Sequence, residues 1–223
     1  MQLPFTVDQF LEVFHRYNLA VWPVQWILGM LGLVAVSLAL SQRRNASRWV
    51  SGILALMWFW MAAAYHLAFF ATINRAAIAF AAAFAVQGML FAWLVVRTTG
   101  VAYRPQSSAA AIIGAALLTY AVVGYPLLGY ALGHRYPAAP TFGVPCPTTI
   151  FTLGLGVWAG ASLPRRLLIA PLAWSIVGTS AAITLGMIED LGLLAAAIAT
   201  VVAAIVRRAD GGTPRGRLYP TGA

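Results

Sequence analysis

The sequence predicts an all-α integral membrane protein, a bundle of seven transmembrane helices in one domain. Two features of its composition point to this class. The 223 residues are 61% hydrophobic and only 9% charged, whereas soluble domains contain about 25% charged residues. The apolar residues also form long runs separated by short connections that carry arginine, which is the pattern of a multi-pass membrane protein. The lipid bilayer is therefore the predicted environment of the protein and one of its predicted partners.

Residues 1–18 are predicted to form an amphipathic helix that lies in the membrane interface before the bundle. Thr6 and Gln9 have the spacing of a capping box, and Phe5 can pack against Phe10 as a hydrophobic staple. The apolar residues share one helical face and the charged residues the other, as in helices that lie on a membrane surface. A plain lead-in to the bundle is the alternative interpretation of this segment.

Seven apolar segments within residues 19–206 are candidates to cross the membrane, which takes about 20 residues per helix. They are 19–41, 49–71, 76–96, 109–132, 148–163, 167–188 and 191–206. The fifth and seventh segments are short. A turn is expected at Glu189 and Asp190, between the sixth and seventh segments, because a charge at the centre of a bilayer costs at least a few kcal/mol.

The arginines predict the orientation of the bundle. All fourteen basic residues are arginine, and eleven of them fall in alternate connections and in the tail. These eleven are Arg43, Arg44, Arg48, Arg97, Arg104, Arg165, Arg166, Arg207, Arg208, Arg215 and Arg217. Short arginine-rich loops stay in the cytoplasm, so the N-terminus is predicted outside and the C-terminus inside a bacterial inner membrane. Residues 207–223, rich in Gly, Pro and Arg, are expected to be a disordered cytoplasmic tail.

This topology gathers the chemically active side chains on the outer, periplasmic face. The candidate ligands are His66, His134, Cys146 and Asp190, and the supporting residues are Arg135, Glu189, Asn74 and Arg75. Zinc or a softer transition metal accepts such nitrogen, sulfur and oxygen ligands. No paired spacing such as Cys-x-x-Cys links any two of them, and histidines at the interface with acids that cap a helix are the alternative. The leading hypothesis is a site for a metal ion or small solute that serves transport or sensing.

Cys146 supports a second hypothesis, a membrane-embedded thiol enzyme. Pro147 suits the first position of a helix, which would make Cys146 its N-cap. The positive end of the helix dipole, with Arg135 nearby, would then favour the reactive thiolate. An inert, packed cysteine is the structural alternative. A third hypothesis is a structural or accessory subunit of a membrane complex, and a homo-oligomer also stays open.

Two cofactors and one class of partner can be assessed from composition. His66 and His134 could ligate a haem, but haem fits less well than a metal ion because His134 falls in a loop. Retinal is excluded because the chain has no lysine to form the Schiff base. The net charge of +9 does not suggest nucleic acid, because the basic residues lie in short loops between apolar runs.

Several motifs resemble those of an uncharacterised family of bacterial multi-pass membrane proteins, catalogued as domain of unknown function 6064. The most specific are Tyr65-His66 with Phe69-Phe70, Gly133-His134-Arg135-Tyr136-Pro137, and Pro145-Cys146-Pro147-Thr148-Thr149. The similarity runs over most of the chain, from Leu3 to Leu191. It implies a small inner-membrane protein of this layout, and it brings no known activity.

Overall fold

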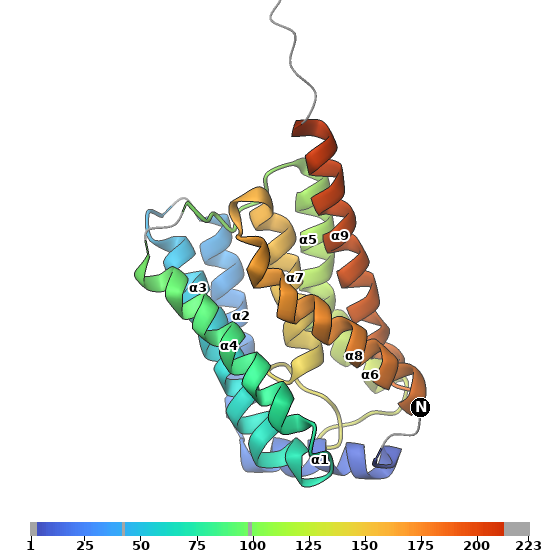
Figure 1. Cartoon of the computed structure of the whole chain (residues 1–223). Coiled ribbons are helices and arrows are strands. Elements are labelled where there is room, and N and C mark those ends of the chain that lie inside the picture. The colour runs from blue at the N-terminus through green and yellow to red at the C-terminus, as the bar shows by residue number, and fades with distance from the viewer. Residues whose placement is uncertain (1–3, 42, 98–99, 212–223) are drawn as a thin grey trace, which may run out of the picture.

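The computed structural model describes residues 4–41, 43–97 and 100–211. Helices make up most of these ranges and are joined by turns and loops, the longest of which spans residues 132–144 (Figure 1). Helical segments lie at all seven predicted positions. The elements before the long central loop are α1 (Val7–Ala20), α2 (Val24–Leu40), α3 (Ala46–Trp60), η1 (Met61–Phe69), η2 (Phe70–Thr72), α4 (Ala77–Val96), α5 (Ser108–Thr119), η3 (Tyr120–Gly124) and α6 (Tyr125–Ala131). After it come α7 (Pro145–Ala159), η4 (Gly160–Ser162), η5 (Arg165–Leu168), α8 (Ile169–Leu185), η6 (Ile188–Leu191) and α9 (Gly192–Gly211).

Five of these segments are long and apolar enough to cross a membrane. They are Ala46–Thr72, Ala77–Val96, Ser108–Ala131, Arg165–Leu185 and Ile188–Val206. A sixth is obtained only if α1 and α2, which meet at a bend of 86°, are taken as one broken span. The predicted count of seven is not confirmed, because α2 has 17 residues and α7 only 15. The helix α9 continues to Gly211, and residues 212–223 of the predicted tail lie outside the described part of the chain.

The outer surface of the bundle exposes many large apolar side chains, which is unfavourable in water. Ile112 on α5 is 70% exposed, and Ile176 and Ile183 on α8 are 74% and 71% exposed. Large contiguous apolar surfaces of this kind mark contact with lipid or a partner, and long helices with satisfied backbones are the form that lipid accepts. The protein is therefore membrane-embedded, whereas the orientation and the identity of the membrane stay predictions.

The helix α1 lies across one end of the bundle (Figure 1). Its start is formed as predicted: Thr6 and Gln9 make the reciprocal capping box, and the rings of Phe5 and Phe10 stack with their centroids 5.8 Å apart. Its apolar face is buried against η1. The Tyr17 hydroxyl accepts a hydrogen bond of 2.7 Å from Nε1 of Trp60, the last residue of α3. Burial raises the pKa of Tyr17 to about 12. A position in the membrane interface stays a prediction for α1.

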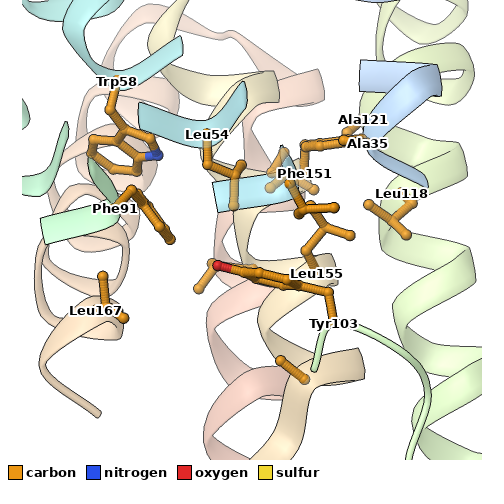
Figure 2. Packing of buried hydrophobic residues seen from close by; sticks show 14 of the residues in the cluster. Ala35, Leu54, Trp58, Phe91, Tyr103, Leu118, Ala121, Phe151, Leu155 and Leu167 are labelled. Carbon is orange, nitrogen blue, oxygen red and sulfur yellow. The ribbon is translucent and has the colours of Figure 1, made fainter. Parts of the chain in front are cut away.

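The helix α7 is the centre of the bundle. Every residue of α7 except Cys146 is buried, and the helix contacts α5, α8 and α9. Figure 2 shows Phe151 and Leu155 of α7 packed with residues of the surrounding helices. The approach of α5 is close: a side-chain carbon at Gly114 would lie 2.2 Å from the Trp158 ring, so only glycine fits there.

Most of the arginines lie at one end of the bundle, and most of the acidic residues lie at the other. The connections α2–α3, α4–α5 and α7–α8, which carry the arginines, lie at one end (Figure 1). The helix α1, the η2–α4 turn, the α6–α7 loop and η6 lie at the other end. This alternation agrees with the sequence prediction for the order of the connections. Four of the five acidic residues belong to the second end: Asp8, Glu12, Glu189 and Asp190.

Candidate functional site

A buried polar cluster lies around η6, at the end of the bundle that α1 covers. Gly186 ends α8 in the left-handed conformation (φ +73°), and the chain then turns sharply into η6. The turn directs the two consecutive acids into the protein, where Glu189 and Asp190 are 0% and 4% exposed. Buried ionisable side chains in a membrane bundle are costly and are usually functional, so this turn is the centre of the candidate site.

Glu189 is held by hydrogen bonds with two residues, one in the α6–α7 loop and one in η3. One carboxylate oxygen, Oε1, lies 2.7 Å from Nδ1 of His134, an ion pair when the imidazole is protonated. The hydroxyl of Tyr120 donates a 2.7 Å hydrogen bond to the backbone carbonyl of Glu189. Gly129 packs beside the carboxylate, since a side-chain carbon there would lie in ordinary contact, 3.4 Å from Oε1. The second oxygen, Oε2, is buried and has no hydrogen-bond partner among the described residues.

Asp190 is held on the other side of the turn. The hydroxyl of Tyr125 donates a short hydrogen bond to Asp190 Oδ1. The thiol of Cys146 faces the same carboxyl group and also lies near the indole of Trp174. His134 pairs with Glu189, and the neighbour of the thiol is thus a carboxyl group and not a histidine base. This arrangement does not favour the thiol-enzyme hypothesis, because a reactive thiolate is stabilised by positive neighbours and would be repelled by the Asp190 carboxylate.

Two π-helical segments position the side chains around the cluster. Such segments are rare and occur often at functional sites, because the wider turn changes which side chains face inward. The segment η3 ends one residue before Tyr125 and begins with Tyr120, so both hydroxyls reach η6. Pro126 follows at the start of α6; it has no N–H to donate, which favours a disturbed helix at this point. The second segment, η1, carries Tyr65 and His66.

His66 lies apart from the carboxylates, inside a cage of aromatic rings. It is 0% exposed, and the ring centroids of Phe84 and Trp174 lie 4.6 and 5.2 Å from that of the imidazole. Within the described part of the chain, neither ring nitrogen of His66 has a hydrogen-bond partner. Trp174 packs against His66 and is also near Cys146, so the two candidate ligands share this neighbour.

The predicted metal site is not supported. In residues 4–41, 43–97 and 100–211, no three His, Cys, Asp or Glu side chains are grouped so that they could hold a metal ion. His134 and Glu189 pair with each other. The other three supporting residues lie outside this pair. Arg135 stacks over the ring of Tyr130 at 5.0 Å, Asn74 accepts a hydrogen bond from the backbone of Ala76, and Arg75 is exposed.

The start of α7 differs from the prediction. The helix begins at Pro145 with Val144 as its N-cap, and Cys146 is therefore inside the first turn. The N-cap assignment of Cys146 was wrong because Pro145 and Pro147 both suit the first turn, where a missing N–H costs nothing. Cys146 is still the one residue of α7 that is partly exposed.

Asn18 is a residue that sequence reasoning missed. It is fully buried, and its Nδ2 donates hydrogen bonds to the carbonyls of Pro137 (2.7 Å) and Ala139 (2.8 Å). Its Oδ1 accepts a third bond, of 2.8 Å, from the Thr141 hydroxyl. Asn18 thus ties α1 to the loop that joins His134 to Cys146. A polar side chain near the end of the apolar face of α1 was the only signal for it in the sequence.

The comparisons with known proteins identify a family. Neither the search of curated proteins nor the search of solved structures gives a match. One family model, described as a family of unknown function (DUF6064), matches residues 7–213, which include every residue of the cluster. The chain therefore belongs to this family of unknown function, DUF6064.

Proposed function

We propose that the protein is a proton-responsive membrane protein in which Glu189 and Asp190 form the proton-binding site. The observation that carries the proposal is the buried oxygen Oε2 of Glu189, which has no hydrogen-bond partner among the described residues although its cluster contains two adjacent carboxyl groups. Every buried polar atom of this kind calls for an explanation, such as a bound proton, ion or water.

The charges of the cluster support a cationic ligand. If both carboxyl groups were ionised, the imidazole of His134 could neutralise only one of them. A buried charge without compensation costs several kcal/mol, and membrane proteins reduce this cost with protons or paired groups. A proton or a small monovalent cation would supply the missing positive charge. A transition metal fits less well, because its usual set of three or more protein ligands is not assembled here.

His134 is suited to connect the cluster with water. Its side chain is 17% exposed, whereas that of Glu189 is fully buried. Histidine exchanges protons near neutral pH and serves as a proton shuttle in many proteins. A proton would pass from water to the imidazole, and from there to the Glu189 carboxylate 2.7 Å away. We further propose that this end faces the periplasm of a bacterial inner membrane, and that the proton serves transport or sensing.

Infrared difference spectroscopy on protein in lipid nanodiscs tests the proposal. Protonation of a buried carboxyl group produces a carbonyl stretching band that appears as the pH is lowered. We expect a band that is reduced in Glu189→Gln and in Asp190→Asn. The matched control is Asp8→Asn, which removes an exposed carboxyl group and should leave the band unchanged.

Two further measurements distinguish a bound proton from a bound monovalent cation and test the role of His134. If the titration of the band moves when Na⁺ or K⁺ replaces a large organic cation, the site binds a monovalent cation in competition with the proton. A His134→Gln variant should slow proton exchange while the band remains. The absence of any titrating buried carboxyl band in the wild-type protein, across the pH range in which it stays folded, would contradict the proposal.

A further inference from the structure

A shallow, open surface groove lies at the opposite, arginine-rich end of the bundle. It runs along α4 and is lined by Val86, Met89, Leu90 and Trp93, with Arg166 of η5 at its edge. Val86 and Met89 are 50% and 54% exposed, so the floor of the groove is apolar surface that lipid must cover. The groove is apolar along its length and cationic at one end.

Two arginines share the indole ring of Trp93. The guanidinium carbon of Arg166 lies 4.6 Å from the ring centroid, and that of Arg97 lies 6.0 Å from it. Stacking on an aromatic ring restrains a guanidinium group while its N–H groups stay free for an acceptor. A third arginine, Arg48, donates a 2.8 Å hydrogen bond from Nε to the Val95 carbonyl, so it reaches the same end of α4.

Among the described side chains, no carboxylate neutralises these positive charges. The only ion pair formed by the described side chains is His134 with Glu189, at the other end of the bundle. Arg97 and Arg166 are exposed and are held close to one ring, although like charges repel. The negative end of the α4 dipole offsets part of this repulsion. An anion that bridges the two guanidinium groups would offset the rest.

We propose that this groove binds an anionic phospholipid. Its phosphate would accept hydrogen bonds from Arg97 and Arg166, since guanidinium groups bind phosphate through paired N–H donors. One acyl chain would lie along Val86, Met89 and Leu90. Basic pockets between transmembrane helices bind anionic headgroups in this way. The inference is independent of the cluster around η6, and it holds for either orientation of the bundle.

Native mass spectrometry of the full chain in detergent tests the proposal, with phosphatidylglycerol and phosphatidylcholine of identical acyl chains as probes. We expect the wild-type protein to prefer phosphatidylglycerol. An arginine beside an anionic headgroup contributes about five-fold to its binding, and the effect falls off within about one Debye length, so Arg97→Gln with Arg166→Gln should reduce the preference by about twenty-five-fold. The matched control is Arg43→Gln with Arg44→Gln, which removes two exposed charges from the same end and should keep the preference.

A Met89→Glu variant tests the acyl-chain part separately. It places a negative charge on the floor of the groove and should weaken binding of both phospholipids, while inorganic phosphate should not displace the lipid from the wild-type protein. Equal binding of the two phospholipids by the wild-type protein would overturn the proposal. An equal loss in the control pair would also overturn it, because the effect would then be general electrostatics and not this groove.

Discussion

Replacement of Asn18 by aspartate is the most direct test of how the site is held together. The substitution keeps the size and shape of the side chain but removes both N–H donors. The carbonyls of Pro137 and Ala139 would lose their bonds of 2.7 and 2.8 Å, and a carboxylate would face them instead. The hydrogen bond from Thr141 would be retained, since it needs only an acceptor.

The magnitude follows from the bonds that are lost. A typical hydrogen bond contributes about 1 kcal/mol net, and a half-buried carbonyl that loses its donor and faces a carboxylate instead costs about 1–3 kcal/mol. Two orphaned carbonyls therefore destabilise the closed loop by about 3 kcal/mol or more. Because 1.4 kcal/mol corresponds to a tenfold change in an equilibrium constant, the loop should open about a hundred-fold more often.

Amide hydrogen exchange, read by mass spectrometry on peptides that cover residues 138–144, measures this opening. Exchange there should accelerate by about a hundred-fold in Asn18→Asp, since local opening governs exchange of protected amides. The control is Asn45→Asp, at an exposed asparagine whose side chain makes no capping bond to α3. If Asn18→Asp exchanges within threefold of the wild-type protein, the loop is held by something other than these bonds.

Two further predictions concern stability in detergent. The unfolding midpoint should fall as pH rises from about 10 through about 12, because burial raises the pKa of Tyr17 to about 12 and that of Tyr103 well above its usual range, so the native state holds these protons more tightly. A flat midpoint there would contradict this. Gly192→Ala should destabilise by about 1–3 kcal/mol, because its Cβ would lie 2.3 Å from the Tyr120 ring. Gly29→Ala, with nothing within 4 Å, should stabilise by about 0.5–1 kcal/mol, and shifts of equal sign would refute the packing argument.

The features that sequence predicted well are those encoded by local signals. Hydropathy located all seven helical segments, and Thr6, Gln9 and Phe5 predicted the start of α1 correctly. The count of seven spans was not confirmed, and the reason is physical. Hydropathy reports that a segment avoids water, but it does not distinguish burial in lipid from burial in protein. The fifth segment, which became α7, is buried in protein.

The candidate site was predicted in part. Glu189, Asp190, His134 and Cys146 were all selected from the sequence, and the structure brings them to one end of the bundle. Their pairing could not be predicted, because the contact between His134 and Glu189 spans 55 residues. The tyrosines of the site were missed because they are placed by η3, and a π-helical turn shifts the register on which any helical-periodicity argument depends.

The burial of α7 has a consequence for how the protein is assembled. A helix of 15 residues is about 22 Å long, whereas the hydrocarbon core of a bilayer is about 30 Å thick. Lipid alone would therefore hold α7 poorly, and it depends on α5, α8 and α9 for its environment. Two of these three helices, α8 and α9, follow α7 in the chain and are synthesised after it. The packing around α7 is therefore incomplete until they have been made. The cluster at η6 lies between α8 and α9 in the chain, so it too can form only after both helices are in place.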